Sequence, residues 1–154
     1  MLRSGRSWKP KITWVHCRRK LEYNWKAMKK INNNLTEEEL IVLRDKGTEW
    51  AFSGKFDSFF EDGTYKCKNC GHELFKSETK YNAGCGWPSF FEAVNEDAII
   101  YRDDHSIFGR PRTEILCSNC EGHLGHVFND GPVDKTGLRY CVNSISLDFD
   151  SEKK

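Results

Sequence analysis

The sequence lacks any long apolar run. Across its 154 residues, no stretch approaches the roughly 18 consecutive apolar residues that a membrane-spanning helix needs. Residues 1–30 also lack the apolar segment of a secretory signal peptide. These absences predict an intracellular protein with no membrane partner, in a compartment that keeps thiols reduced.

Acidic residues are nearly missing from the start of the chain. Residues 1–30 hold ten Lys and Arg and one acid, Glu22, whereas the rest holds fourteen Lys and Arg against twenty-two acids, a net charge of −8. The acidic remainder disfavours nucleic acid as a partner. Residues 1–34 are interpreted as a basic N-terminal tail that either targets mitochondria or has no specific role. A mitochondrial and a cytoplasmic location both stay open.

The folded domain is expected over residues 35–150, followed by a short C-terminal tail at 151–154. Thr36 and Glu39 have the spacing of a capping box. They predict a helix that runs to about Lys46, with Gly47 as its C-cap.

From Thr48 onward, short β-branched and aromatic segments alternate with Gly, Asn, Asp and Pro. Regularly spaced short strands of this kind favour a mainly β, mostly antiparallel fold with a few short helices. Strands are predicted near residues 64–67, 73–76, 98–102, 106–108, 112–117, 124–128 and 138–149.

The last of these strands has an unusual pattern. Alternate residues of a strand share one face, and here Ile145, Leu147 and Phe149 are apolar. On the same face, Arg139, Cys141 and Asn143 provide a cation, a thiol and an amide. This arrangement indicates a binding or reactive surface, although an unpaired cysteine can also be a small core residue.

Seven cysteines in a reducing compartment indicate metal binding or catalysis rather than disulfides. Two Cys-x-x-Cys pairs, each after a predicted strand, would complete a tetrahedral structural zinc site. The 46 intervening residues mean that the metal would join two distant parts of one domain. The four predicted ligands are Cys67, Cys70, Cys117 and Cys120.

Two other interpretations of the pairs rank lower. One pair alone could be a redox dithiol. Alternatively, Cys117 and Cys120 could bind a metal together with His123 and His126. That site would leave the first Cys-x-x-Cys pair without a role.

Cys85 lies between Gly84 and Gly86, which predicts an accessible loop rather than a core segment. An accessible thiol invites a redox role. Trp87 offers a flat apolar surface that would suit an apolar part of a substrate, or it anchors the loop in the core. Cys17 has no partner nearby, and no role is assigned to it.

Three longer motifs, residues 84–90, 123–132 and 137–144, together resemble the B-type methionine sulfoxide reductases. The resemblance covers about residues 35–150, and both Cys-x-x-Cys pairs fall where zinc-containing members of that family have theirs. It implies a fold of two antiparallel sheets, called a β-tent, with a few helices. It also implies reduction of the R epimer of methionine sulfoxide, preferably in proteins.

The resemblance implies a role for each matching residue. Cys141 corresponds to the catalytic cysteine and Cys85 to the resolving cysteine, while Trp87 and Phe128 correspond to the walls that contact the substrate methyl group. His123, His126, Arg139 and Asn143 correspond to polar residues that line the family's site. Asp130 corresponds to an acid with a supporting role. The family further implies thioredoxin as reductant, and a monomer is expected.

This chemistry suits the residues. A thiolate must attack the sulfoxide sulfur, and Arg139, two residues before Cys141, can favour that thiolate. His123 or His126 could protonate the oxygen, or be a structural residue. The two histidines reach one side only through a turn or a bulge, which Gly125 permits. The resulting sulfenic acid would condense with Cys85, whose loop could swing toward it.

A different class of function is a zinc-ribbon binding module without catalysis. The two Cys-x-x-Cys pairs alone would allow it. It would leave Cys85, Trp87 and Cys141 without a role.

Overall fold

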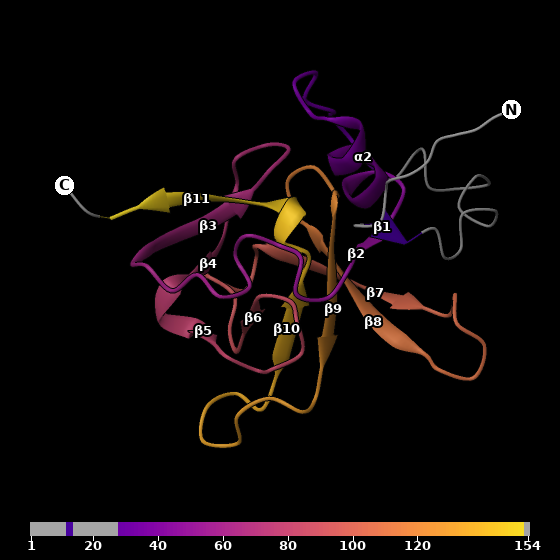
Figure 1. Ribbon diagram of the computed structural model, residues 1–154. Coiled ribbons are helices and arrows are strands. Elements are labelled where there is room, and N and C mark those ends of the chain that lie inside the picture. Colours follow the sequence, from indigo (N-terminus) through magenta and orange to yellow (C-terminus); the bar gives the residue numbers. More distant parts are fainter. Residues whose placement is uncertain (1–11, 14–27, 153–154) are drawn as a thin grey trace, which may run out of the picture.

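The structure is a computed structural model in which residues 12–13 and 28–152 are described (Figure 1). Most of the tail, including Cys17, lies outside the described residues. In chain order the elements are β1 (Ile12–Thr13), α2 (Glu37–Leu43), β2 (Thr48–Glu49), β3 (Gly63–Cys67), β4 (Glu73–Lys76), η2 (Ser77–Thr79), β5 (Lys80–Tyr81), β6 (Ser89–Phe90), β7 (Ile99–Asp104), β8 (Arg112–Cys117), β9 (His123–Phe128), β10 (Arg139–Val142), η3 (Ser144–Ser146) and β11 (Leu147–Ser151). Among them, no helix is long and apolar enough to cross a bilayer.

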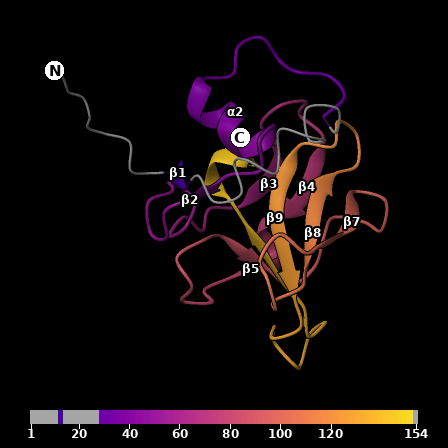
Figure 2. The ribbon, with the colours of Figure 1, turned by 90° about the vertical axis from the view of Figure 1, so that its right-hand side faces the viewer.

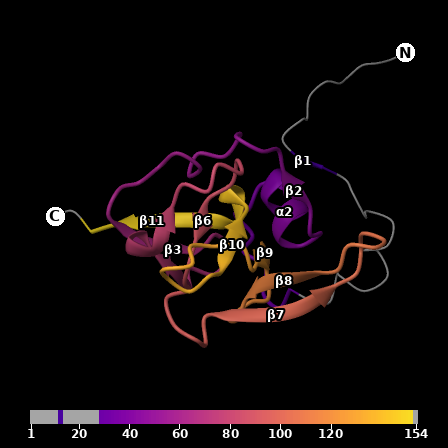
Figure 3. The same ribbon diagram turned by 90° about the horizontal axis from the view of Figure 1, so that it is seen from below.

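Two antiparallel sheets form the body of the domain. The larger has six strands in the order β5-β6-β10-β9-β8-β7, and the smaller has three in the order β11-β3-β4. A two-residue pairing of β1 with β2 lies beside them. Figures 1 and 3 show the two sheets at an angle, with α2 beside the end of β9. The prediction of a mainly β fold with two antiparallel sheets and few helices is confirmed.

Aromatic side chains join the two sheets. Phe75 of β4 stacks on Phe90 of β6 with ring centroids 4.3 Å apart. The ring of Tyr65 in β3 packs edge-on against the Phe90 ring, with centroids 5.1 Å apart. The ring of Tyr140 in β10 packs against the Phe75 ring, with centroids 5.5 Å apart. Such pairs add about 0.5–1.5 kcal/mol each beyond their burial. The core therefore lies directly behind β10, the strand that carries Cys141.

The predicted strand at 138–149 is wrong as a single element. The chain leaves the large sheet after Val142, forms the short helix η3 and enters the small sheet as β11. The carboxylate of Glu49 causes this break, because it accepts hydrogen bonds from the backbone N–H groups of Ser144 and Ile145 at 2.8 and 3.0 Å. Ile145 consequently packs beside α2 rather than sharing a face with Cys141.

The helix prediction holds at its start and fails at its end. Thr36 and Glu39 form the capping box, but α2 stops at Leu43, before the expected end. Lys46, not Gly47, adopts the positive φ of 62°. The backbone N–H of Gly47 bonds to the carbonyl of Ile41 at 2.8 Å, which closes the helix end. Lys46 is thereby placed over β8, as described below.

The prediction of a strand at 106–108 is also wrong. These residues form the turn between β7 and β8, in which Gly109 takes a φ of +75° and the Phe108 side chain is fully exposed. Conversely, β2, β5 and β6 were not predicted. Each has two residues, too few to show the alternation by which a strand is recognised.

Residues 28–34 lie against the domain, although the sequence assigned them to the basic tail. Met28 is buried, and the backbone N–H of Lys29 bonds to the carbonyl of Cys120 at 2.7 Å. Asn69 accepts from the backbone N–H of Asn32 and donates to the carbonyl of Lys30. This stretch therefore contacts both Cys-x-x-Cys segments.

Gly125 lets β9 and β10 approach closely. A Cβ atom at this position would lie 2.0 Å from the carbonyl oxygen of Cys141. We expect Gly125→Ala to lower the free energy of unfolding by about 3 kcal/mol or more, since a backbone clash cannot be relieved by a rotamer change. Gly109→Ala is the control, with φ +75° and open space around it, and should cost about 1 kcal/mol. Urea denaturation measures both, and equal losses would contradict this account.

Candidate active site and metal centre

A pocket of about 210 Å³ is lined by β9, β10 and the loop that carries Cys85. It brings together seven residues that the sequence predicts for the site: Cys85, Trp87, His126, Phe128, Arg139, Cys141 and Asn143. Thr48 and Arg112, which the sequence did not single out, also line it. His123 does not.

The pairing of β9 with β10 positions the central residues. Cys141 lies opposite His126, and Arg139 lies opposite Phe128. The guanidinium of Arg139 stacks over the Phe128 ring, 4.5 Å from its centroid. Asp130 holds the same guanidinium through two hydrogen bonds of 2.8 and 3.2 Å. This pairing raises the pKa of Arg139 and lowers that of Asp130. The arrangement keeps a fixed cation beside Cys141.

Cys85 and Cys141 are free cysteines that line the same pocket, near enough for each to shift the pKa of the other. Cys141 is the main reason why the pKa of Cys85 falls to about 5, and the Ser89 hydroxyl at 3.3 Å helps. The pKa of Cys141 is raised, chiefly by Cys85 and then by burial, while Arg139 lowers it by less. Arg139 therefore acts on Cys141 in the direction that favours its thiolate, while Cys85 and burial oppose it.

The loop of Cys85 is tied down on one side. Gly84 and Gly86 take φ values of +74° and +96°. The carbonyl of Gly86 accepts from the backbone N–H of Phe52 at 2.7 Å, whereas a Cβ at Gly84 would meet nothing within 4 Å. Because Cys85 and Cys141 already line the same pocket, no large swing of the loop is needed for Cys85 to reach Cys141.

Glu49 orients two residues of the pocket. Its carbonyl accepts from the indole N–H of Trp87 at 3.1 Å, and its own N–H donates to Oδ1 of Asn143 at 2.9 Å. Nδ2 of Asn143 donates to the carbonyl of Leu124 at 3.0 Å. Both ends of the Asn143 amide are therefore used by the backbone. These bonds fix the position of Asn143 and the direction of the Trp87 ring.

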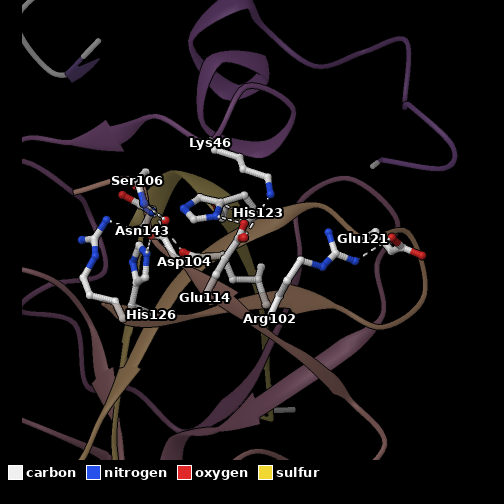
Figure 4. Close-up of polar contacts among 12 residues, drawn as sticks. Lys46, Arg102, Asp104, Ser106, Glu114, Glu121, His123, His126 and Asn143 are labelled. Atoms are coloured by element: carbon white, nitrogen blue, oxygen red, sulfur yellow. Dashed lines mark hydrogen bonds and ion pairs between the residues drawn. The ribbon is translucent and has the colours of Figure 1, made fainter. Parts of the chain in front are cut away.

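A bulge places the two histidines on one side of the sheet, as the sequence predicts. The register of β8 and β9 shifts at Leu124, and the rings of His123 and His126 lie 5.6 Å apart (Figure 4). His126 Nε2 bonds to Asp104 at 2.8 Å. Burial lowers the pKa of His126, and Asp104 opposes this only in part. The pKa of Asp104 is also lowered, mainly by His126, so a carboxylate faces a neutral imidazole protonated at Nε2.

His123 lies behind the pocket. It is 2% exposed, and its Nδ1 bonds to Glu114 at 2.7 Å, while Lys46 bonds to the other oxygen of Glu114 at 3.0 Å (Figure 4). Burial raises the pKa of Glu114, but His123 and Lys46 outweigh it and lower the pKa to about 2. The structure thus gives the predicted pair of histidines different places, with His126 at the pocket and His123 in a buried ion cluster.

Arg112 and Asp104 are site residues that sequence reasoning missed. Arg112 lines the pocket and bonds to Asp104 at 2.9 Å, on the oxygen that also meets His126. A signal existed: Arg112 and Glu114 are charged residues on one face of a predicted strand. The sequence does not show that β8 pairs with β9, so it could not place the face with Arg112 and Glu114 beside the two histidines.

The four cysteines of the two Cys-x-x-Cys pairs form one cluster. Their sulfur atoms all lie within 4.8 Å of one another. Cys67 is 3.7 Å from Cys120, and Cys70 is 3.6 Å from Cys117. Sulfurs bound tetrahedrally at the Zn–S distance of about 2.3 Å are separated by about 3.8 Å, so the donor set fits a tetrahedral metal ion. The alternative site with His123 and His126 is wrong, because both histidines bond to carboxylates instead.

The cluster joins distant parts of the fold. One pair follows β3 and the other follows β8, which belong to different sheets (Figure 2). Fold and site together favour one class: an oxidoreductase with two free cysteines in one pocket and a separate four-cysteine cluster that could hold a metal ion.

Comparison with known proteins narrows the class. The chain matches the SelR domain over residues 35–151. It is 51% identical to a peptide methionine sulfoxide reductase MsrB of Pasteurella multocida over 126 residues, which cover 82% of this chain and 95% of that protein. Proteins of the same name from Teredinibacter turnerae and Leptospira interrogans are 54% and 51% identical, covering 79% and 86% of this chain and 88% and 95% of theirs. The chain belongs to this family, the B-type peptide methionine sulfoxide reductases, and is an oxidoreductase. A binding module without catalysis does not fit this membership.

Proposed function

We propose that the protein reduces the R epimer of methionine sulfoxide, mainly in oxidised proteins, through Cys141 as nucleophile and Cys85 as resolving cysteine. The observation that carries the proposal is that these two free cysteines line one pocket, which also contains Trp87 and Phe128. A pocket of this size admits one side chain. The aromatic rings suit the methyl group, and the polar side with Arg112 and His126 suits the sulfoxide oxygen.

The first step transfers oxygen to Cys141. Its thiol proton passes to the Cys85 thiolate as the Cys141 sulfur attacks the substrate sulfur. Methionine leaves, reduced by two electrons, and Cys141 becomes a sulfenic acid, oxidised by two electrons. The lowered pKa of His126 makes it a hydrogen-bonding partner of the oxygen rather than a resident imidazolium. The proton that ends on the oxygen then comes from the thiol pair.

The second step forms a disulfide. The Cys85 thiol attacks the sulfenic sulfur of Cys141 and releases water. A dithiol reductant, thioredoxin in the simplest case, then restores both thiols and takes up the disulfide. One chain contains the complete set of residues for this cycle, so the protein would act as a monomer.

The four-cysteine cluster is proposed to hold one structural zinc ion. Its sulfur spacing fits zinc, and a site with four protein ligands leaves no open position for a substrate. The catalytic steps involve Cys85 and Cys141, which lie outside it.

The proposal is tested with Cys85→Ser and a peptide that carries either epimer of methionine sulfoxide. Without reductant, both wild type and variant should convert about one R-epimer peptide per chain, because each chain has one Cys141 to oxidise. The variant should do so more slowly, because it lacks the Cys85 thiolate that takes up the proton. Wild type should end as a disulfide, whereas the variant should keep a sulfenic acid and lose thioredoxin-driven cycling. Chromatography of the peptide and dimedone labelling measure these outcomes. Equal consumption of the S epimer would refute the substrate, and undiminished cycling of the variant would assign resolution to another thiol, such as Cys17.

A further inference from the structure

Cys85 lies between two hollows of the surface, and Cys141 lines only the first. The substrate pocket of about 210 Å³ contains both thiols. A second hollow of about 470 Å³ contains Cys85 and Arg139 together with residues of two turns. These are Tyr81, Asn82, Ala83, Asp130, Gly131 and Pro132. Cys85 can therefore be approached from a side that does not contain Cys141.

This second side matters for the disulfide form. Thiol–disulfide exchange is a displacement at sulfur, in which the attacking thiolate, the attacked sulfur and the leaving sulfur lie nearly in line. A thiolate that attacks Cys85 must therefore arrive from the side opposite to Cys141. The second hollow reaches Cys85 without Cys141 in its lining, whereas the substrate pocket leads to both sulfurs.

Arg139 lines both hollows, and its charge lowers the pKa of both cysteines. Asp130 holds the guanidinium in place from the rim of the second hollow.

The second hollow is open and its walls are formed by exposed, fixed turns. On one side Asn82 and Ala83 are exposed, and Asn82 accepts from the backbone N–H of Gly84 at 3.0 Å. On the other side the loop between β9 and β10 is closed by a bond of 2.9 Å from the N–H of Gly137 to the carbonyl of Pro132, and Val133 at its tip is 95% exposed (Figure 1). An open space between two projecting turns suits a surface loop of another protein.

We propose that a protein dithiol reductant docks between the turn at Asn82–Ala83 and the turn at Pro132–Val133, and attacks Cys85 through this hollow while the oxidised substrate uses the other. The inference rests on the proposed disulfide cycle. The reductant thiolate bonds to Cys85 and the Cys85–Cys141 bond breaks, leaving Cys141 as a thiolate. The second thiol of the reductant then attacks its own first sulfur, so the reductant leaves as a disulfide and Cys85 is released.

The test compares three single substitutions that each add an acid to an exposed tip. Ala83→Glu alters one wall of the hollow and Val133→Glu lies next to Pro132 of the other, while Phe108→Glu, fully exposed in the β7–β8 turn, is the matched control. For the wall variants we expect the KM for thioredoxin to rise about tenfold, the effect expected for one disturbed interface contact. The first turnover without thioredoxin, and turnover driven by dithiothreitol, should stay at the wild-type values.

A trapping experiment tests the attacked sulfur. Thioredoxin that lacks its second cysteine should form a mixed disulfide with Cys85 and leave Cys141 free, and the wall variants should form it more slowly than Phe108→Glu. Trapping on Cys141, an unchanged KM in both wall variants, or an equal effect of Phe108→Glu would overturn the docking site. Absence of the first turnover in wild type would instead refute the proposed function, and the docking site would fall with it.

Discussion

Replacing Cys141 by serine should abolish reduction of methionine sulfoxide, with a loss of roughly a thousandfold or more, as for removal of nucleophiles in other enzymes. A serine hydroxyl stays protonated at neutral pH and cannot take up oxygen as a sulfenic acid. The substitution changes one atom, so the pocket and the pairing of β10 with β9 should persist. The measurement is release of methionine from an R-epimer peptide in a single turnover, which does not depend on the reductant.

Two controls separate lost chemistry from lost structure. The Cys141→Ser protein should keep its metal content and its urea midpoint. Cys17→Ser, the same substitution at a cysteine outside the described residues, should leave the first turnover at the wild-type rate. Retention of activity by Cys141→Ser would contradict the mechanism, and equal loss in Cys17→Ser would mean that another thiol takes part.

The sequence predicted those parts of the site that depend on local pattern. The two Cys-x-x-Cys pairs, the glycine-flanked Cys85 and the residues on either side of Cys141 can each be recognised within ten positions of the chain. The spacing of the two histidines left a turn or a bulge open, and the structure has a bulge. These features reappear in the structure because backbone geometry within one segment decides them.

The features of the structure that the sequence did not predict depend on contacts between residues far apart in the chain. The break after Val142 depends on Glu49, whose carboxylate caps Ser144 from 95 positions away in the chain. In isolation, residues 138–149 keep the alternation of one strand, and the pattern alone predicts one. The capping carboxylate is visible only once the fold brings the two segments together.

The separate places of the two histidines have a similar cause. Both had the chemistry of a site residue, but Glu114 binds His123 in the interior and Asp104 binds His126 at the pocket. Each acid belongs to a strand whose partner cannot be deduced from composition. The mutual effect of Cys85 and Cys141 on their pKa values was hidden for the same reason, since it depends on the fold bringing both into one pocket.

The metal centre should decide whether the domain folds at all. Structural zinc binds with an apparent free energy of roughly 10–16 kcal/mol in small sites, which equals or exceeds the roughly 5–15 kcal/mol by which a domain is stable. The centre joins the end of β3 to the end of β8, in different sheets. Its loss therefore removes a link that the aromatic contacts between the sheets do not replace.

We accordingly expect Cys120→Ser to hold well under one zinc ion per chain and to unfold far below the wild-type temperature, since three thiolates remain around a buried gap. Cys85→Ser is the matched control, because it removes a cysteine outside the cluster, and it should retain about one zinc ion and the wild-type transition. Metal analysis after purification without chelator, and thermal unfolding with and without EDTA, measure both effects. If Cys120→Ser melted like Cys85→Ser, or if wild type held no zinc, the cluster would not be a structural zinc site. The cysteines would then have to be explained by thiol chemistry of their own.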